Sequence, residues 1–240
     1  MKDLKLLNDT RLKICIISFG PIESKGNGYF IRVWSILREL SKLGKILVLE
    51  FPETYVKNKI KKVGNIIFVR LRGNEITSSR ISNVMIKIFT FDPLHNLKFQ
   101  ILSFIELWKH RKYLSSADVV MIEGCLIPAG NIIAKLLRKK IILDTHCINK
   151  LLAIGYRKRH LLPYILRTCL WDILERLTIR LSDIVIAVSK KEKEYIIKNY
   201  GTYKSKVLVI PNARIEQPKN VSKEVVKGLR KKLDLKIKLL

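Results

Sequence analysis

The sequence of 240 residues predicts an α/β fold in which a parallel sheet carries helices on both faces. Short apolar runs of strand length alternate with amphipathic helical patterns along the chain. Residues 12–51 follow the order strand, glycine-containing loop, helix and strand, which is the βαβ unit of parallel sheets. The apolar runs are continuous, as expected for strands that are covered on both faces.

Three elements make up the first unit. Residues 12–18 form a continuous apolar run and predict the first strand. From Phe30 to Leu40 apolar residues recur at helical spacing, and Gly44 just beyond is typical of a helix end. Residues 45–51 predict the second strand, which Pro52 ends.

The same alternation continues through the rest of the chain. Further strands are predicted at residues 66–71, 118–122, 140–143, 183–188 and 207–210. Helices are predicted at residues 81–90, 97–114, 128–137, 166–181 and 190–200.

The chain divides into one domain and a short remainder. Residues 1–214 predict the α/β domain, and residues 215–221 are polar and contain a proline, like an interdomain linker. A short helix and the start of a strand follow, so residues 215–240 are interpreted as a linker and the truncated beginning of a second domain.

Composition excludes several classes of protein. Lys and Arg number 47 against 20 Asp and Glu, a formal net charge of +27, while 48% of the residues are hydrophobic; this composition is globular and not disordered. The four cysteines lie far apart without metal-ligand spacing, so neither a disulfide scaffold nor a metal site is predicted. The apolar runs are too short to span a membrane, and a signal peptide is not expected.

The order of several short segments is more specific than any of them alone. These segments are residues 11–18, 25–28, 31–33, 41–48, 118–122, 141–146, 171–175, 182–189 and 207–212. Together they resemble the N-terminal half of the family 4 glycosyltransferases, which have the GT-B architecture of two Rossmann-like domains facing across a cleft. The resemblance covers about residues 11–214 and departs from the family at Pro211-Asn212-Ala213, where a glycine is usual in place of Ala213.

The resemblance implies a function and what would complete it. It implies a retaining, metal-independent transferase that uses a nucleotide sugar as donor substrate, with no other cofactor, and a lipid-linked or other glycan as acceptor. The donor-binding domain of this family is not found in the sequence, so a partner chain is one expected source of it. A transferase-derived regulatory subunit without activity is an alternative.

Polar residues that follow predicted strands are candidates for the site. Asp144 and His146 lie at a strand's carboxyl end, where ligands of open α/β sheets bind, and Glu123 follows another strand. The Gly26-Asn27-Gly28 loop precedes a helix, so its backbone N–H groups could hold a diphosphate, although a flexible loop explains the glycines equally well. The resemblance assigns His146 to the acceptor pocket as the catalytic candidate.

Two other acidic residues have simpler explanations. Ser189 and Glu192 have the spacing of a helix capping box. Glu175 has Asp172 and Arg176 beside it on a predicted helix, which favours a solvated, ion-paired face over a role in the cleft.

The positive charge requires a partner. Basic and bulky apolar residues mix at residues 154–162, which include Arg157, Lys158 and Arg159, and along the aromatic stretch from Phe89 to Trp108. This mixture favours peripheral binding to the cytoplasmic face of an anionic membrane. A generally basic surface and a nucleic-acid-binding module are the alternatives, but no nucleic-acid recognition motif accompanies the charge.

Overall fold

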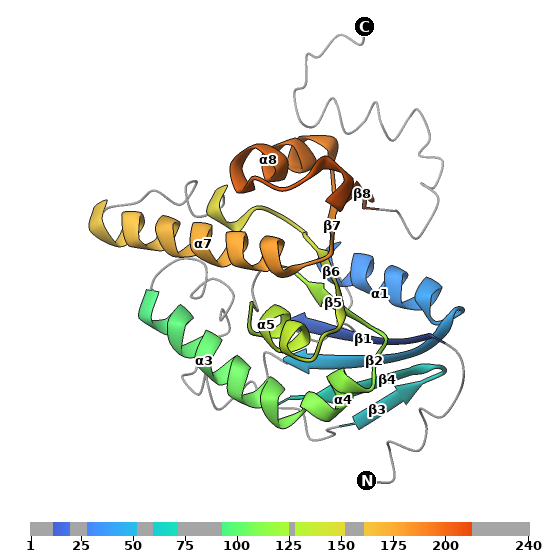
Figure 1. The fold of residues 1–240 in the computed structure, drawn as a ribbon. Helices are drawn as coiled ribbons and strands as arrows, with labels where there is room; N and C mark the ends of the chain where they lie inside the picture. Colours follow the sequence, from blue (N-terminus) through green and yellow to red (C-terminus); the bar gives the residue numbers. More distant parts are fainter. Residues whose placement is uncertain are drawn as a thin grey trace, which may run out of the picture.

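The predicted α/β architecture is confirmed by the computed structural model, which describes residues 12–19, 28–51, 60–71, 93–124, 128–151 and 161–212. These residues build an eight-stranded sheet with the order β3-β4-β2-β1-β5-β6-β7-β8 (Figure 1). Neighbouring strands are parallel, except that the edge strand β3 runs antiparallel to β4. The strands are β1 (Leu12–Phe19), β2 (Gly44–Phe51), β3 (Ile60–Val63), β4 (Ile66–Arg70), β5 (Val119–Glu123), β6 (Lys140–Asp144), β7 (Ile184–Ala187) and β8 (Val207–Val209).

Helices cover both faces of this sheet, as predicted (Figure 1). The described helices are α1 (Gly28–Leu40), α3 (Pro93–Lys109), α4 (Arg111–Ser115), α5 (Pro128–Leu136), α7 (Leu161–Leu181), α8 (Lys190–Tyr200) and the short 3-10 helix η3 (Lys204–Lys206). Val33 and Leu37 of α1 pack against one face of the sheet. Residues of α3, α5, α7 and α8 form a second apolar cluster on the opposite face.

Two elements differ from the sequence prediction. The strand β3 was not predicted, because its sequence Ile-Lys-Lys-Val is mostly exposed at the sheet edge and lacks an apolar run. The helix predicted at residues 97–114 is interrupted at His110, whose backbone leaves the helical region (φ −96°, ψ 10°), so that α3 and α4 are separate. The predicted helix at residues 81–90 and the segment 215–240 lie outside the described residues.

Gly44 has a packing role beyond ending a helix. It begins β2 directly opposite Leu12 of β1, and a Cβ atom at this position would collide with the Leu12 carbonyl group. The first parallel pair of strands therefore requires glycine here.

Candidate functional site

The strand order has a topological switch point between β1 and β5. β1 pairs with β2 on one side and with β5 on the other, so the helical connections leave β1 and β5 in opposite directions along the sheet. Open α/β sheets bind ligands at the carboxyl ends of strands at such a switch point. Glu123 ends β5 and Asp144 ends the neighbouring β6, so both predicted residues lie at this edge.

A buried polar row crosses the sheet at this edge. Strand register aligns Arg70 with Glu50, Glu50 with Ser18, and Glu123 with Asp144. The pairing of Ile17 with Ile122 then makes Ser18 and Glu123 the next residues of adjacent strands. Their side chains continue the α1 face of the sheet, where the preceding positions are apolar. Four of the five residues in this row are at most 1% exposed. Polar side chains therefore occupy positions at which packing alone would favour apolar ones.

Arg32 of α1 binds Asp144, which is the last residue of this row. Its guanidinium binds Asp144 in a bidentate manner, with Nε donating to Oδ2 at 2.9 Å and Nη2 donating to Oδ1 at 2.7 Å. Nη1 donates to the carbonyl oxygen of Ile210 at 2.9 Å and to Oδ1 of Asn212 at 3.1 Å. Arg32 is 4% exposed and Asp144 is fully buried. Through these charge-assisted hydrogen bonds, Arg32 connects α1 both to the end of β6 and to the segment that follows β8.

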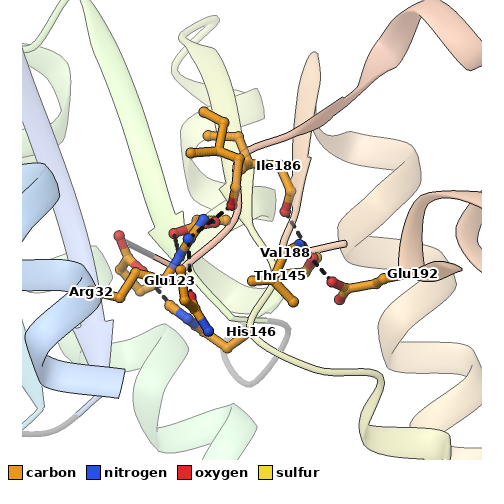
Figure 2. A network of polar contacts seen from close by, with 10 residues as sticks. Arg32, Glu123, Thr145, His146, Ile186, Val188 and Glu192 are labelled. Atoms are coloured by element: carbon orange, nitrogen blue, oxygen red, sulfur yellow. Dashed lines mark hydrogen bonds and ion pairs between the residues drawn. The ribbon is translucent and has the colours of Figure 1, made fainter. Parts of the chain in front are cut away.

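His146 and Glu123 form a second polar pair beside it. Nε2 of His146 lies 2.7 Å from Oε2 of Glu123, and the histidine side chain is 14% exposed while the carboxyl is fully buried. Gly124 follows Glu123 with a φ of +75°, a conformation that glycine adopts easily, and the chain turns there past the His146 ring. Figure 2 shows Arg32, Glu123 and His146 converging at this point.

Burial sets the protonation of these groups. It raises the pKa of Glu123 to about 8 and lowers the pKa of His146 to about 4. Burial also raises the pKa of Asp144 to about 6, against the opposing hydrogen bonds from Arg32. At neutral pH, Asp144 is therefore ionised and paired with Arg32, whereas burial favours the uncharged forms of both Glu123 and His146, whose contact then requires one hydrogen between Oε2 and Nε2. When Nε2 of a neutral His146 accepts this hydrogen, the ring hydrogen of His146 is on Nδ1.

The cluster is a poor fit for a metal ion. One possible ligand atom from each of Glu123, Asp144 and His146 lies within 4.8 Å of the others. However, both Asp144 oxygens accept hydrogen bonds from Arg32, and Nε2 of His146 is bonded to Glu123. A cation would have to displace these bonds next to a buried guanidinium, so the donor set favours hydrogen bonding to a ligand over metal coordination.

Only part of the other predicted sites is described. Gly28 is the first residue of α1, so it lies at a helix N-terminus as predicted. Gly26, Asn27 and the basic segment Arg157, Lys158 and Arg159 lie outside the described residues.

Sequence reasoning missed Arg32. It lies in the predicted first helix, where a basic residue suggests a solvated face, and its main partner is 112 positions away. A charged residue among Phe30, Ile31 and Val33 on the apolar side of that helix was the one available signal.

The prediction that Glu175 lies on a solvated face is wrong. Glu175 is fully buried, accepting hydrogen bonds from the backbone N–H of Asn149 at 2.5 Å and of Lys150 at 3.3 Å. The Tyr200 hydroxyl donates to it at 2.6 Å. Asp172 takes the solvated ion pairs that were expected on this helix, with Lys150 and Arg176. Glu175 therefore holds the segment that follows His146.

The predicted capping box at Ser189 is confirmed with one difference. The Ser189 hydroxyl accepts a hydrogen bond from the Glu192 N–H at 3.1 Å. The Glu192 carboxylate reaches back to the N–H of Val188 at 2.7 Å, one residue before the cap.

Within the part of the chain that the structure describes, no helix is both long and apolar enough to cross a bilayer.

Comparison with known proteins relates this geometry to a family. The sequence profile of Glycosyltransferase Family 4 matches residues 66–214. No curated protein matches the chain by sequence.

Solved structures resemble the fold at low sequence identity. Sucrose-phosphate synthase from Thermosynechococcus elongatus has a TM-score of 0.61 at 16% identity, over 94% of this chain and 53% of that one. The E. coli trehalose-6-phosphate protein bound with UDP-2-fluoro glucose has a TM-score of 0.56 at 13% identity, over 92% and 54%. A UDP-forming trehalose-phosphate synthase from Burkholderia xenovorans, in complex with glucose-6-phosphate, has a TM-score of 0.51 at 13% identity, over 78% and 43%. The chain thus spans about half the length of these structures.

Proposed function

Because this chain belongs to Glycosyltransferase Family 4, we propose that it forms the acceptor-side domain of a glycosyltransferase. This enzyme moves a sugar from a nucleotide-sugar donor to a lipid-linked or other glycan acceptor. The observation that carries the proposal is the buried contact of 2.7 Å between His146 and Glu123 at the sheet's switch point. Similar structures carry UDP-2-fluoro glucose or glucose-6-phosphate, which supports sugar chemistry at this edge.

His146 and Glu123 have complementary roles in this proposal. The His146 Nδ1–H donates a hydrogen bond to the sugar or to the departing phosphate, which stabilises negative charge as it develops there. Oε1 of Glu123 is buried and has no hydrogen-bond partner among the described residues. An acceptor hydroxyl that approaches it would satisfy a polar atom that otherwise costs free energy.

Arg32 and Asp144 hold the neighbouring site residues in position. Both carboxylate oxygens of Asp144 accept hydrogen bonds from Arg32. We therefore assign Asp144 to positioning the chain at His146 and not to binding the substrate. The Gly26-Asn27-Gly28 loop and the N-terminus of α1 remain the proposed diphosphate site, because backbone N–H groups and the helix dipole favour an anion there.

A second domain would supply the donor contacts, whether it lies on the same polypeptide or on a partner chain. We place the first domain at residues 1–214 and the start of the second at residues 215–240. The family match ends at residue 214, which supports this boundary.

Replacement of His146 tests the proposal. In the enzyme assembled with its donor-binding domain, His146→Ala should lower transfer from nucleotide sugars by at least about 100-fold, the usual contribution of a positioned proton-transfer or charge-stabilising group. The melting temperature should stay within a few degrees, because the imidazole is at the surface edge of the core. His110→Ala, at the junction of α3 and α4, is the matched control and should retain full activity. Retained turnover in His146→Ala would contradict the role of His146 and favour a regulatory subunit.

The membrane part of the proposal depends on α3. Ile101, Ile105 and Trp108 follow at helical spacing and are 52%, 45% and 40% exposed. The guanidinium of Arg111 lies 5.1 Å from the centre of the Trp108 ring, so a basic group accompanies this apolar face. Anionic lipid attracts basic residues while apolar side chains enter the interface. We propose that α3 contacts the cytoplasmic membrane surface.

Vesicle binding tests this contact. The chain should co-sediment with vesicles containing phosphatidylserine and not with pure phosphatidylcholine, and Ile101→Glu should reduce the bound fraction. Leu43→Glu changes another exposed apolar residue, in the turn between α1 and β2, and should have no effect. Equal binding of both vesicle types, or equal effects of both variants, would refute the contact.

A further inference from the structure

A cavity of about 440 Å³ is lined in part by Cys147, the residue that follows His146. One wall is the segment after β6, with Ile148 and Leu151, and the other is the start of α8, with Val188 and Tyr195. Its volume lies within the range of small-molecule sites, and these side chains give it an apolar lining. None of the roles assigned above uses this space.

The lining contains two charged residues, Lys191, which is exposed, and Glu192, which is buried. Glu192 is the one that bears on ligand binding. It is 8% exposed, and one of its oxygens accepts the N–H of Val188. The other oxygen, Oε1, is buried and makes no hydrogen bond within the described ranges. The nearby Thr145 hydroxyl donates its single hydrogen to the Ile186 carbonyl group. Figure 2 shows Glu192, Val188 and Thr145 next to one another at the edge of the site.

Both walls of the cavity are held in place. The Glu175 carboxylate accepts the N–H groups of Asn149 and Lys150, which lie on the first wall. The same carboxylate accepts the hydroxyl of Tyr200 at the end of α8, the helix that forms the second wall. One buried side chain therefore fixes the separation of the two walls, and the cavity does not have to form on binding.

We propose that this cavity binds the aliphatic part of an amphiphilic acceptor, with Oε1 of Glu192 accepting a hydrogen bond from a hydroxyl group at the head of that chain. An apolar lining with one unsatisfied acceptor matches an alkyl or prenyl chain that begins beside a hydroxylated group. Cys147 of the lining directly follows His146, which leaves the sugar end of the acceptor at the reacting centre. This inference rests on the proposed function, because it identifies the substrate class of the same site.

Alkyl glucosides are suitable probes for the full chain. Titration with n-octyl β-D-glucoside below its micelle concentration, followed by amide NMR shifts, should perturb Leu151, Val188 and Tyr195. Methyl β-D-glucoside should bind at least tenfold more weakly, because each buried methylene group strengthens binding roughly fourfold.

Two pairs of variants locate the binding. Leu151→Glu adds a charge at the wall and should abolish the chain-length dependence, whereas Leu43→Glu at an exposed distant leucine should keep it. Glu192→Gln keeps an acceptor for the Val188 N–H but replaces the other oxygen with a donor, so octyl glucoside should bind about tenfold more weakly. Ser189→Ala removes the capping hydroxyl without changing the carboxylate and should bind within about twofold of the parent.

Several results would overturn the proposal. One is equal binding of the octyl and methyl compounds, and another is an affinity that Leu151→Glu does not change. A third is loss of binding in Ile101→Glu instead, which would place the chain in the apolar groove between α3 and α7. These outcomes are independent of transfer, since His146→Ala tests the proposed function without altering the cavity walls.

Discussion

The buried pair of Arg32 and Asp144 leads to a quantitative prediction about stability. Asp144→Asn keeps the size of the side chain but removes its charge, and it leaves a guanidinium that is 4% exposed without a counter-ion. Arginine does not lose its proton in proteins, and the pKa of Arg32 is raised further by Asp144 although burial acts to lower it. The charge therefore remains in the folded state.

The size of the effect follows from this geometry. Removing one partner of a buried ion pair costs about 3–5 kcal/mol. For a chain of this length each kcal/mol lowers the melting temperature by about 2–4 °C, so Asp144→Asn should melt about 6–20 °C lower. Arg32→Met combined with Asp144→Leu removes both charges and should recover about half of the loss.

Thermal and urea denaturation measure these differences. Glu39→Gln is the control, because Glu39 pairs with Lys42 at the surface, where both side chains are more than half exposed. It should leave the free energy of unfolding almost unchanged, because solvent and salt screen an exposed pair. An Asp144→Asn protein within 1 kcal/mol of the parent would refute the reasoning, since the buried pair would then behave like the exposed one.

Two other predictions concern buried carboxyl groups. Because burial raises the pKa of Glu123 from 4.5 to about 8, the folded state binds an extra proton between these values, and this group's contribution to stability falls as the pH rises from about 4.5 to 8. Glu123→Gln should therefore gain stability relative to the parent across this interval in urea titrations; a difference that does not change with pH would show that Glu123 is ionised throughout. Glu175→Gln should speed hydrogen exchange at the amides of Asn149 and Lys150, because a neutral amide is a weaker acceptor for both N–H groups. Tyr200→Phe removes one hydrogen bond to the same carboxyl and should lower the free energy of unfolding by about 1 kcal/mol without exposing these amides. Unchanged exchange in Glu175→Gln would contradict the role assigned to Glu175.

The sheet was predictable because its strands carry continuous apolar runs. Residues 14–17 and 46–49 are buried on both faces, so burial and sequence pattern coincide there. β3 was not predictable in this way, since an exposed edge strand has no need of an apolar run. The break at His110 was not predictable either, because no proline or glycine marks it.

The candidate site was predictable in part. Strand ends located Glu123, Asp144 and His146, because chain order alone places residues at the carboxyl edge of a parallel sheet. The partners of these residues could not be predicted in the same way. Arg32 and Glu175 lie on helices and act through contacts over 112 and 25 or more positions, where local charge patterns favoured solvent exposure.

The contacts of Arg32 also constrain how the domain assembles during synthesis. The guanidinium belongs to α1, near the start of the described residues, but its acceptors are Asp144 and then Ile210 and Asn212, 178 and 180 residues later. If α1 packed on the sheet before residues 210–212 had left the ribosome, the N–H groups of Arg32 Nη1 would be buried without acceptors. Such burial costs free energy, so it is disfavoured until these residues are available. Docking of α1 is therefore a late step in folding. A fragment that ends before residue 210 would keep the Asp144 pair but lose both acceptors of Arg32 Nη1, so we expect the most stable form of the domain to extend to Asn212.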